Sequence, residues 1–239
     1  MTPLVFVHGF MGGSAQWALQ APLGASRDLI TLDLPGFGAN ADLPAIDSIA
    51  GFATWALSEI RRRGVEQFHL MGHSMGGMIV QEMVRQAPDR VDKLIIYGSG
   101  PSGDLPGRFE TFDTSKRRFA EDGVEATARR ISATWFLDFE AAAEYPNCAA
   151  IACESAPAAL PAALDAMKAW DGVSALPQIS SDTLIIWGDG DRTYKWPQIH
   201  RLWSDIPGAS LAVIPKCAHA THLEAPEIFN DCVDRFLRA

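Results

Sequence analysis

Short apolar runs alternate with longer segments of helical periodicity along most of this chain. The runs are apolar at successive positions, as strands are when helices cover both faces of a sheet. Such alternation is typical of βα units and predicts a parallel sheet of about six strands. The predicted strands are residues 3–7, 28–32, 67–71, 93–97, 183–187 and 210–214, and the clearest helical segments are 48–63, 75–86, 194–203 and 226–237.

The rhythm breaks between residues 101 and 178. No strand pattern occurs there, alanines are frequent, and aromatic residues recur among polar ones. Prolines interrupt the alanine-rich part, so it must form several short helices, because proline inside a helix removes a hydrogen bond and clashes with the preceding turn. We therefore expect a core of residues 1–100 and 179–239, with a helical lid of residues 101–178 inserted after the fourth strand.

Composition narrows the class of partner. The 239 residues carry a formal net charge of −9 and are 48% hydrophobic, which is enough to bury a full core. An acidic chain is a poor match for nucleic acid or anionic lipid, since both require a basic face. The start of the sequence shows no charged leader, and no run approaches the roughly 20 apolar residues of a membrane span, so we expect a cytoplasmic protein. We expect it to be a monomer or a dimer.

The four cysteines are too few for a disulfide scaffold and lack the paired spacing of a metal site. We expect reduced thiols, with a bridge between Cys148 and Cys153 left open as an alternative. The other two are Cys217 and Cys232.

The strongest local motif is Gly72-His73-Ser74-Met75-Gly76. This G-x-S-x-G stands between an apolar strand and a helix, the setting of a nucleophile elbow, where a sharp turn lifts the serine hydroxyl above the sheet. Glycines at both ends let strand and helix approach closely. The context predicts that Ser74 is a nucleophile.

A serine hydroxyl is a weak nucleophile and requires a general base and a residue that orients the base. In open α/β sheets such groups follow the carboxyl ends of strands. Asp189 and Asp191 follow the fifth predicted strand and His219 follows the sixth, so the order is Ser, Asp, His, as in a hydrolase triad. The aspartates could also be ordinary turn residues, because turns favour Gly and Asp.

Two further patterns bear on the chemistry. The first predicted strand ends in a glycine-rich loop, residues 8–13, which could present one backbone N–H to an oxyanion, with the N–H of Met75 as the second donor. We expect His8 to hold this loop in place.

His219, His222 and Glu224 could instead bind a metal, but they precede Pro226 in a loop and no further protein ligand is evident.

Five stretches together resemble the α/β-hydrolase family, close to its small esterase and enol-lactonase branch, over essentially the whole chain. They are VHGF (7–10), DLPGFG (33–38), GHSMGG (72–77), WGDGDRTY (187–194) and AHATHLEAP (218–226). By that resemblance Ser74 is the nucleophile, Asp191 the acid and His219 the base, with Phe10 and Met75 as the oxyanion hole. His222 is then a packing or hydrogen-bonding residue.

The resemblance also implies an α/β-hydrolase fold. Family members usually carry a β-hairpin before the strand that leads into the VHGF stretch. In this chain that strand is residues 3–7, almost at the start of the sequence. We therefore expect a wholly parallel sheet of about six strands with residues 28–32 at one edge. Glu224 reads as a helix-entry residue whose charge suits a helix N-terminus.

The expected activity is hydrolysis of a small to medium, largely apolar carboxylic ester or lactone through an acyl-enzyme, without metal or cofactor. Two alternatives stay open: a carbon–carbon bond hydrolase of ring-cleavage products, and an esterase of carrier-protein or thioester-linked methyl esters. A non-catalytic receptor on the same fold is a remote third. The predicted substrate-contacting aromatic residues are Trp17, Phe37, Trp135, Phe136 and Phe139.

Overall fold

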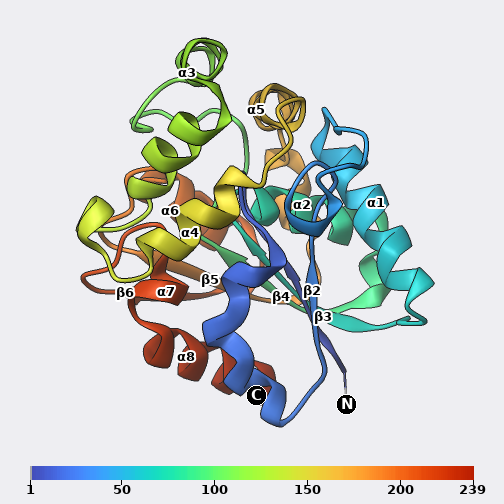
Figure 1. Cartoon of the computed structure of the whole chain (residues 1–239). Helices are drawn as coiled ribbons and strands as arrows, with labels where there is room; N and C mark the ends of the chain where they lie inside the picture. Colours follow the sequence, from blue (N-terminus) through green and yellow to red (C-terminus); the bar gives the residue numbers. More distant parts are fainter. Residues whose placement is uncertain (1) are drawn as a thin grey trace.

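A parallel β-sheet forms the centre of the molecule in the computed structural model, which describes residues 2–239 (Figure 1). Among these residues the sheet has six strands in the order β2-β1-β3-β4-β5-β6, all paired in parallel. From β1 the chain adds β2 on one side and then β3 and the later strands on the other side. The loops that follow β1 and β3 therefore run in opposite directions and leave a crevice at the carboxyl ends of these strands. The strands are β1 (Leu4–Val7), β2 (Leu29–Leu32), β3 (Phe68–His73), β4 (Val91–Tyr97), β5 (Asp182–Gly188) and β6 (Ser210–Ile214).

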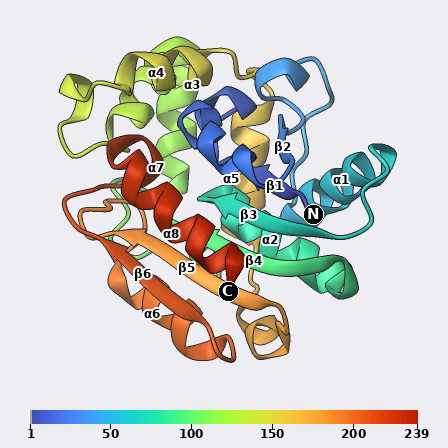
Figure 2. The same ribbon diagram turned by 90° about the horizontal axis from the view of Figure 1, so that it is seen from below.

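Both faces of the sheet are buried. On β1, Val5 and Val7 belong to one hydrophobic cluster, while Leu4 and Phe6 belong to the other. The first cluster is covered by α1 (Ile49–Arg62), α2 (Met75–Gln86) and α6 (Trp196–Asp205), and the second by α8 (Pro226–Arg238) and the 3-10 turns of Ser14–Ala25. Figure 2 shows α6 and α8 on opposite sides of β5 and β6. Strands sandwiched in this way must be apolar on both faces, which explains the uninterrupted apolar runs.

Helix ends follow local capping chemistry. The hydroxyl of Ser48 accepts a hydrogen bond from the N–H of Gly51 (3.2 Å) and begins α1. The helix predicted from residue 194 begins at Trp196, because the Gln198 side chain caps the N–H of Lys195 (2.8 Å) and fixes the start there. The short helix α7 (Thr221–Glu224) precedes α8.

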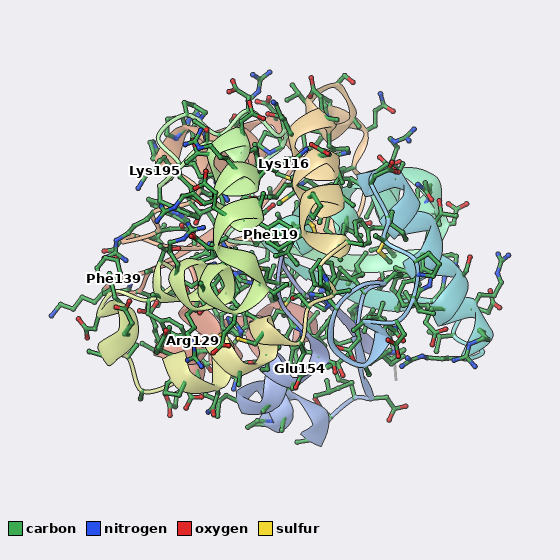
Figure 3. The ribbon with its side chains drawn as sticks, turned by 45° about the horizontal axis from the view of Figure 1, so that its top comes forward. Lys116, Phe119, Arg129, Phe139, Glu154 and Lys195 are labelled. Carbon is green, nitrogen blue, oxygen red and sulfur yellow. The ribbon has the colours of Figure 1, made fainter. Side chains whose placement is uncertain are left out.

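The segment between β4 and β5 is helical and lies over the carboxyl ends of the strands (Figure 1). It contains α3 (Phe112–Ala133), α4 (Tyr145–Cys153) and α5 (Ala159–Ala169). A bridge between Ser102 and Asp171 ties its two ends together. Across its outer surface, Lys116 of α3 binds Asp165 of α5 at 2.7 Å (Figure 3). This segment roofs the crevice of the sheet.

The structure confirms the predicted fold class: a wholly parallel sheet with β2 at one edge, flanked by helices. Each predicted strand is present within two residues of its expected ends. Cys148 and Cys153 are free thiols, so the alternative of a bridge between them is wrong. Within residues 2–239, none of the helices has both the length and the apolar character that crossing a bilayer requires.

Candidate active site

Ser74 occupies a strained turn between β3 and α2. Its backbone has φ 57° and ψ −119°, outside the regions that L-residues normally adopt. The turn is possible because Gly72 and Gly76 lack side chains: a Cβ on Gly72 would overlap the carbonyl of Gly76, and one on Gly76 would overlap the carbonyl of Val7. Strain of this kind persists at functional sites when the surroundings hold it in place. This is the predicted elbow geometry.

His219 and Asp191 form a buried pair. Nδ1 of His219 lies 2.8 Å from Oδ2 of Asp191, and both side chains are almost fully buried. The other carboxylate oxygen accepts the N–H groups of Thr193 (2.6 Å) and Tyr194 (3.1 Å). Three hydrogen bonds thus hold Asp191 in one orientation, and the imidazole presents its other nitrogen, Nε2, away from the carboxylate.

Asp189 has a different environment from Asp191. Its carboxylate accepts the N–H of Lys216 at 2.8 Å, at an exposed turn between the loops after β5 and β6. Asp189 is therefore an ordinary turn residue, which was the alternative considered for both aspartates. Asp191 is the aspartate that contacts His219.

The backbone of His219 is held as firmly as its ring. Its carbonyl oxygen accepts hydrogen bonds from Nε2 of His73 (3.0 Å) and from the hydroxyl of Tyr97 (2.7 Å). The rings of His73 and Tyr97 stack on each other with centroids 4.4 Å apart. Burial lowers the pKa of His73 well below its usual value, which outweighs the opposite effect of its hydrogen bond to His219 and keeps the ring neutral.

Glu224 braces the same loop. Its carboxylate accepts the N–H of Ala218 (2.6 Å) and the N–H of Leu137 at the lid (2.7 Å). Its expected role as a helix-entry charge is wrong, because Glu224 ends α7 and turns back toward the His219 loop instead of facing the first turn of α8. Partial burial raises the pKa of this carboxyl.

His219 and His222 bind different partners. His222 is buried, and its Nδ1 lies 3.0 Å from the hydroxyl of Tyr97, whereas the ring of His219 faces Asp191. Their rings are thus engaged separately and do not converge on one point, as ligands of a shared metal would. The structure supports the packing and hydrogen-bonding role expected for His222.

The loop after β1 approaches Ser74 from the opposite side. A Cβ on Gly9 would lie 2.9 Å from Cβ of Ser74, so glycine is required for this approach. His8 holds the loop: its Nε2 accepts the N–H of Leu34 (3.0 Å), and burial lowers its pKa to about 4. Within residues 2–239, the N–H groups of Phe10 and Met75 bind no protein acceptor, which is what oxyanion donors require.

A small cavity joins Ser74 and His219. Its volume is about 20 Å³, room for roughly one water molecule. The residues on its wall are Phe10, Ser74, Leu105, Arg108, Phe109, Phe112, Ile131, Trp135, Met167, Thr193, Tyr194 and His219. Among the predicted aromatic contacts, Trp135 alone lies here.

The other four predicted contacts lie elsewhere. Trp17 packs against Phe6 (centroids 5.0 Å apart) in the cluster under α8, on the far face of the sheet. Phe37 and Phe136 are fully buried and do not line the cavity. Phe139 is 42% exposed and points outward at the rim of the lid (Figure 3). The structure does not place these four predicted contacts in the cavity beside Ser74, because aromatic character alone does not determine which face of the molecule a residue occupies.

Several residues of the cavity wall were not predicted from the sequence, and Tyr194 and Arg108 are the two polar ones with the clearest contacts. The ring of Tyr194 stacks on that of His219 with centroids 5.7 Å apart and planes at 21°, and burial raises its pKa to about 12. Its place three residues after Asp191, in the loop after β5, is a signal that could have found it. Arg108 lies in an irregular stretch before α3, where no periodicity marks it.

Comparisons with known proteins agree with this architecture. The model described as "Alpha/beta hydrolase family" matches residues 4–231. A pimeloyl-[acyl-carrier protein] methyl ester esterase of Nitrosomonas europaea is 28% identical over 248 residues, covering 97% of this chain and 94% of the relative.

A second relative is a 2-hydroxy-6-oxononadienedioate/2-hydroxy-6-oxononatrienedioate hydrolase of Pseudomonas sp., 25% identical over 246 residues and covering 98% of this chain and 87% of its own. Among solved structures, the enol-lactonase of Burkholderia xenovorans superposes with a TM-score of 0.90 at 19% identity, covering 100% of this chain and 92% of that one. At this identity the superposition shows the fold alone.

Proposed function

This chain belongs to the alpha/beta hydrolase family, and we propose that it is a serine hydrolase that cleaves a carboxylic ester or lactone through an acyl-enzyme. The observation that carries the proposal is the arrangement at the carboxyl ends of the strands. Ser74, on a strained elbow, and His219, paired at 2.8 Å with the buried Asp191, line one cavity. Nucleophile, base and orienting acid are the parts that acyl transfer requires.

In the proposed acylation step, the Ser74 hydroxyl oxygen attacks the substrate carbonyl carbon while Nε2 of His219 takes the hydroxyl proton. Asp191 keeps the proton on Nδ1 and stabilises the imidazolium that forms. The N–H groups of Phe10 and Met75 receive the oxyanion, and a single such donor is typically worth about 2.7–4 kcal/mol of the barrier. Collapse of the tetrahedral adduct breaks the ester bond, and His219 returns the proton to the leaving alcohol.

Deacylation repeats these steps with water. His219 removes a proton from a water molecule as its oxygen attacks the acyl carbon, and then returns the proton to Ser74 as the acid departs. The cavity has room for about one water at present. Substrate entry therefore requires the lid residues over Ser74 to move, a gating motion common among enzymes with closed sites.

The cavity wall favours an apolar acyl or alcohol group. Five of the residues that line it are large and apolar: Phe109, Phe112, Ile131, Trp135 and Met167. Burial of apolar substrate surface against such a wall stabilises the complex by roughly 25 cal/mol per Å². The two relatives, a methyl ester esterase and a dienedioate hydrolase by name, support a carbonyl substrate, and they differ in the bond that is cleaved.

A substrate panel tests the proposal. Purified protein is assayed with p-nitrophenyl esters of increasing chain length, lactones, a thioester and a dienoate carbon–carbon substrate. We expect turnover of esters or lactones that falls at least about 10³-fold in Ser74→Ala and is unchanged in Ser58→Ala, which alters an exposed serine of α1. Ester turnover that survives Ser74→Ala would refute the mechanism, and exclusive turnover of the dienoate would favour the carbon–carbon hydrolase.

A further inference from the structure

Arg108 is a cation on the wall of an otherwise largely apolar cavity. It lines the space that also contains Ser74 and His219. Among residues 2–239 its guanidinium forms no ion pair with a carboxylate. Burying a charge without a partner costs free energy of folding. Such a group therefore indicates a function in binding.

The contacts of Arg108 leave part of its guanidinium free. Nη1 donates to the carbonyl of Glu110 and to the hydroxyl of Ser115 (3.2 Å). The guanidinium carbon lies 4.3 Å from the ring centroid of Phe109 and 4.9 Å from that of Phe112, so two aromatic rings hold its plane. Within the described chain, Nε and Nη2 have no acceptor. These adjacent N–H groups form the fork that binds a carboxylate through two parallel hydrogen bonds.

Two acids near Arg108, Glu110 and Asp191, already have partners. The carboxylate of Glu110 accepts from Arg130 (2.9 and 3.0 Å) and Arg118 (3.2 Å). The carboxylate of Asp191 is held by His219 and by two backbone N–H groups. Burial lowers the pKa of the Arg108 guanidinium, yet arginine remains protonated in proteins. An anion from outside the chain is thus the natural counterpart of this charge.

The position of Arg108 also suits a substrate contact. Leu105, Arg108 and Phe112 line the catalytic cavity on one side and a surface groove of about 490 Å³ on the other. These three residues separate the groove from Ser74. Next to Arg108 the backbone of Gly107 is left-handed, with φ 79°. A substrate that passes from the groove to Ser74 must displace this wall, so it meets Arg108 on the way in.

We propose that Arg108 is a specificity-determining residue that binds a free carboxylate on the substrate, in addition to the scissile ester or lactone. The substrate class is then a monoester or lactone derived from a dicarboxylic or hydroxycarboxylic acid. This inference rests on the proposed hydrolase function.

Matched substrate pairs test the role of Arg108. Monoethyl adipate and ethyl hexanoate share the acyl chain and differ by a carboxylate in place of a methyl group. The pair 6-acetoxyhexanoate and hexyl acetate places the same difference on the alcohol side. We expect the wild-type protein to prefer the anionic member of one pair in kcat/KM, and the preferred pair identifies the side that Arg108 contacts.

Three variants define the interaction. Arg108→Gln is expected to lower kcat/KM for the preferred anion about 10–100-fold, mainly through KM, because a charged hydrogen-bonded pair is lost, and to change the neutral partner less than about 3-fold. Arg108→Lys keeps the charge without the fork and is expected to fall between. Arg117→Gln, which removes an exposed charge of the following helix α3, is expected to leave turnover of both substrates unchanged.

A binding measurement separates this inference from the proposed function. Calorimetry with adipate and Ser74→Ala protein is expected to detect binding that Arg108→Gln abolishes and Arg108→Lys weakens. Turnover of all four esters with no anion preference, together with no adipate binding, would overturn the role of Arg108 while leaving the hydrolase proposal intact. Turnover of none of them, with adipate bound through Arg108, would instead count against the ester hydrolase.

Discussion

Acid is expected to unfold this protein through its buried histidines. His8, His73 and His222 are all buried near the candidate active site: His73 and His222 lie side by side with ring centroids 5.3 Å apart, and His8 holds the loop after β1. Burial lowers the pKa of His8 to about 4 and that of His222 to about 3, and it lowers that of His73 well below the usual value. In the unfolded chain each would titrate near 6.5. Between pH 6.5 and about 4 the unfolded state therefore binds more protons than the folded state, and stability falls as the pH falls.

The magnitude follows from the distance between the two pKa values. At pH 5 a histidine that is charged only when unfolded costs about 2 kcal/mol relative to pH 7.5, because each pH unit below 6.5 contributes about 1.36 kcal/mol. His8 and His222 together account for about 4 kcal/mol, and His73 acts in the same direction. A typical domain has only about 5–15 kcal/mol of stability, so this loss is a large fraction of it.

Urea unfolding at pH 7.5, 6 and 5 measures the effect. The free energy of unfolding is expected to fall by at least about 4 kcal/mol from pH 7.5 to 5. In His222→Gln, which removes one titrating group, the fall is expected to be about 2 kcal/mol smaller. His200→Gln on the surface helix α6 is the matched control and is expected to follow the wild type. A stability that changes by less than about 1 kcal/mol over this range would refute the reasoning.

Four substitutions test the candidate site itself. His219→Ala is expected to abolish turnover, while His222→Ala lowers stability and leaves much of the turnover, as steady-state kinetics would show; the opposite pattern would reverse the assignment of the base. Glu224→Ala removes two hydrogen bonds to a carboxylate and is expected to lower the free energy of unfolding by about 2–4 kcal/mol and kcat about 10-fold, whereas an unchanged kcat would show that the brace does not position the base. Gly76→Ala drives a methyl group into the carbonyl of Val7 and is expected to give insoluble or unfolded protein, and a folded, active variant in circular dichroism and ester assays would contradict the close approach.

Much of the fold follows from local patterns. The strands could be predicted because apolar runs buried on both faces differ clearly from amphipathic helices. Ser74 and His219 could be placed because each follows a strand, and parallel strands bring their carboxyl ends to one edge of the sheet. Even the minor disagreements at helix ends come from single side chains, such as the cap of Gln198 on Lys195.

The contacts between distant segments could not be predicted. Trp17 has the aromatic character of a pocket residue, but its 3-10 turns cross to the α8 side of the sheet, and no local pattern specifies that face. Glu224 is bound to Leu137, 87 residues away in the sequence, so its role as a brace depends on how the lid packs. Arg108 likewise reaches the cavity from an irregular stretch, where no helix or strand pattern indicates the direction of a side chain.

The most direct test of the central claim is mass spectrometry after labelling with a fluorophosphonate, which reacts with activated serines. The account predicts one adduct per chain, mapped to Ser74, absent from Ser74→Ala and formed far more slowly in His219→Ala. Absence of labelling in the folded native protein, or an adduct that persists in Ser74→Ala, would contradict the account.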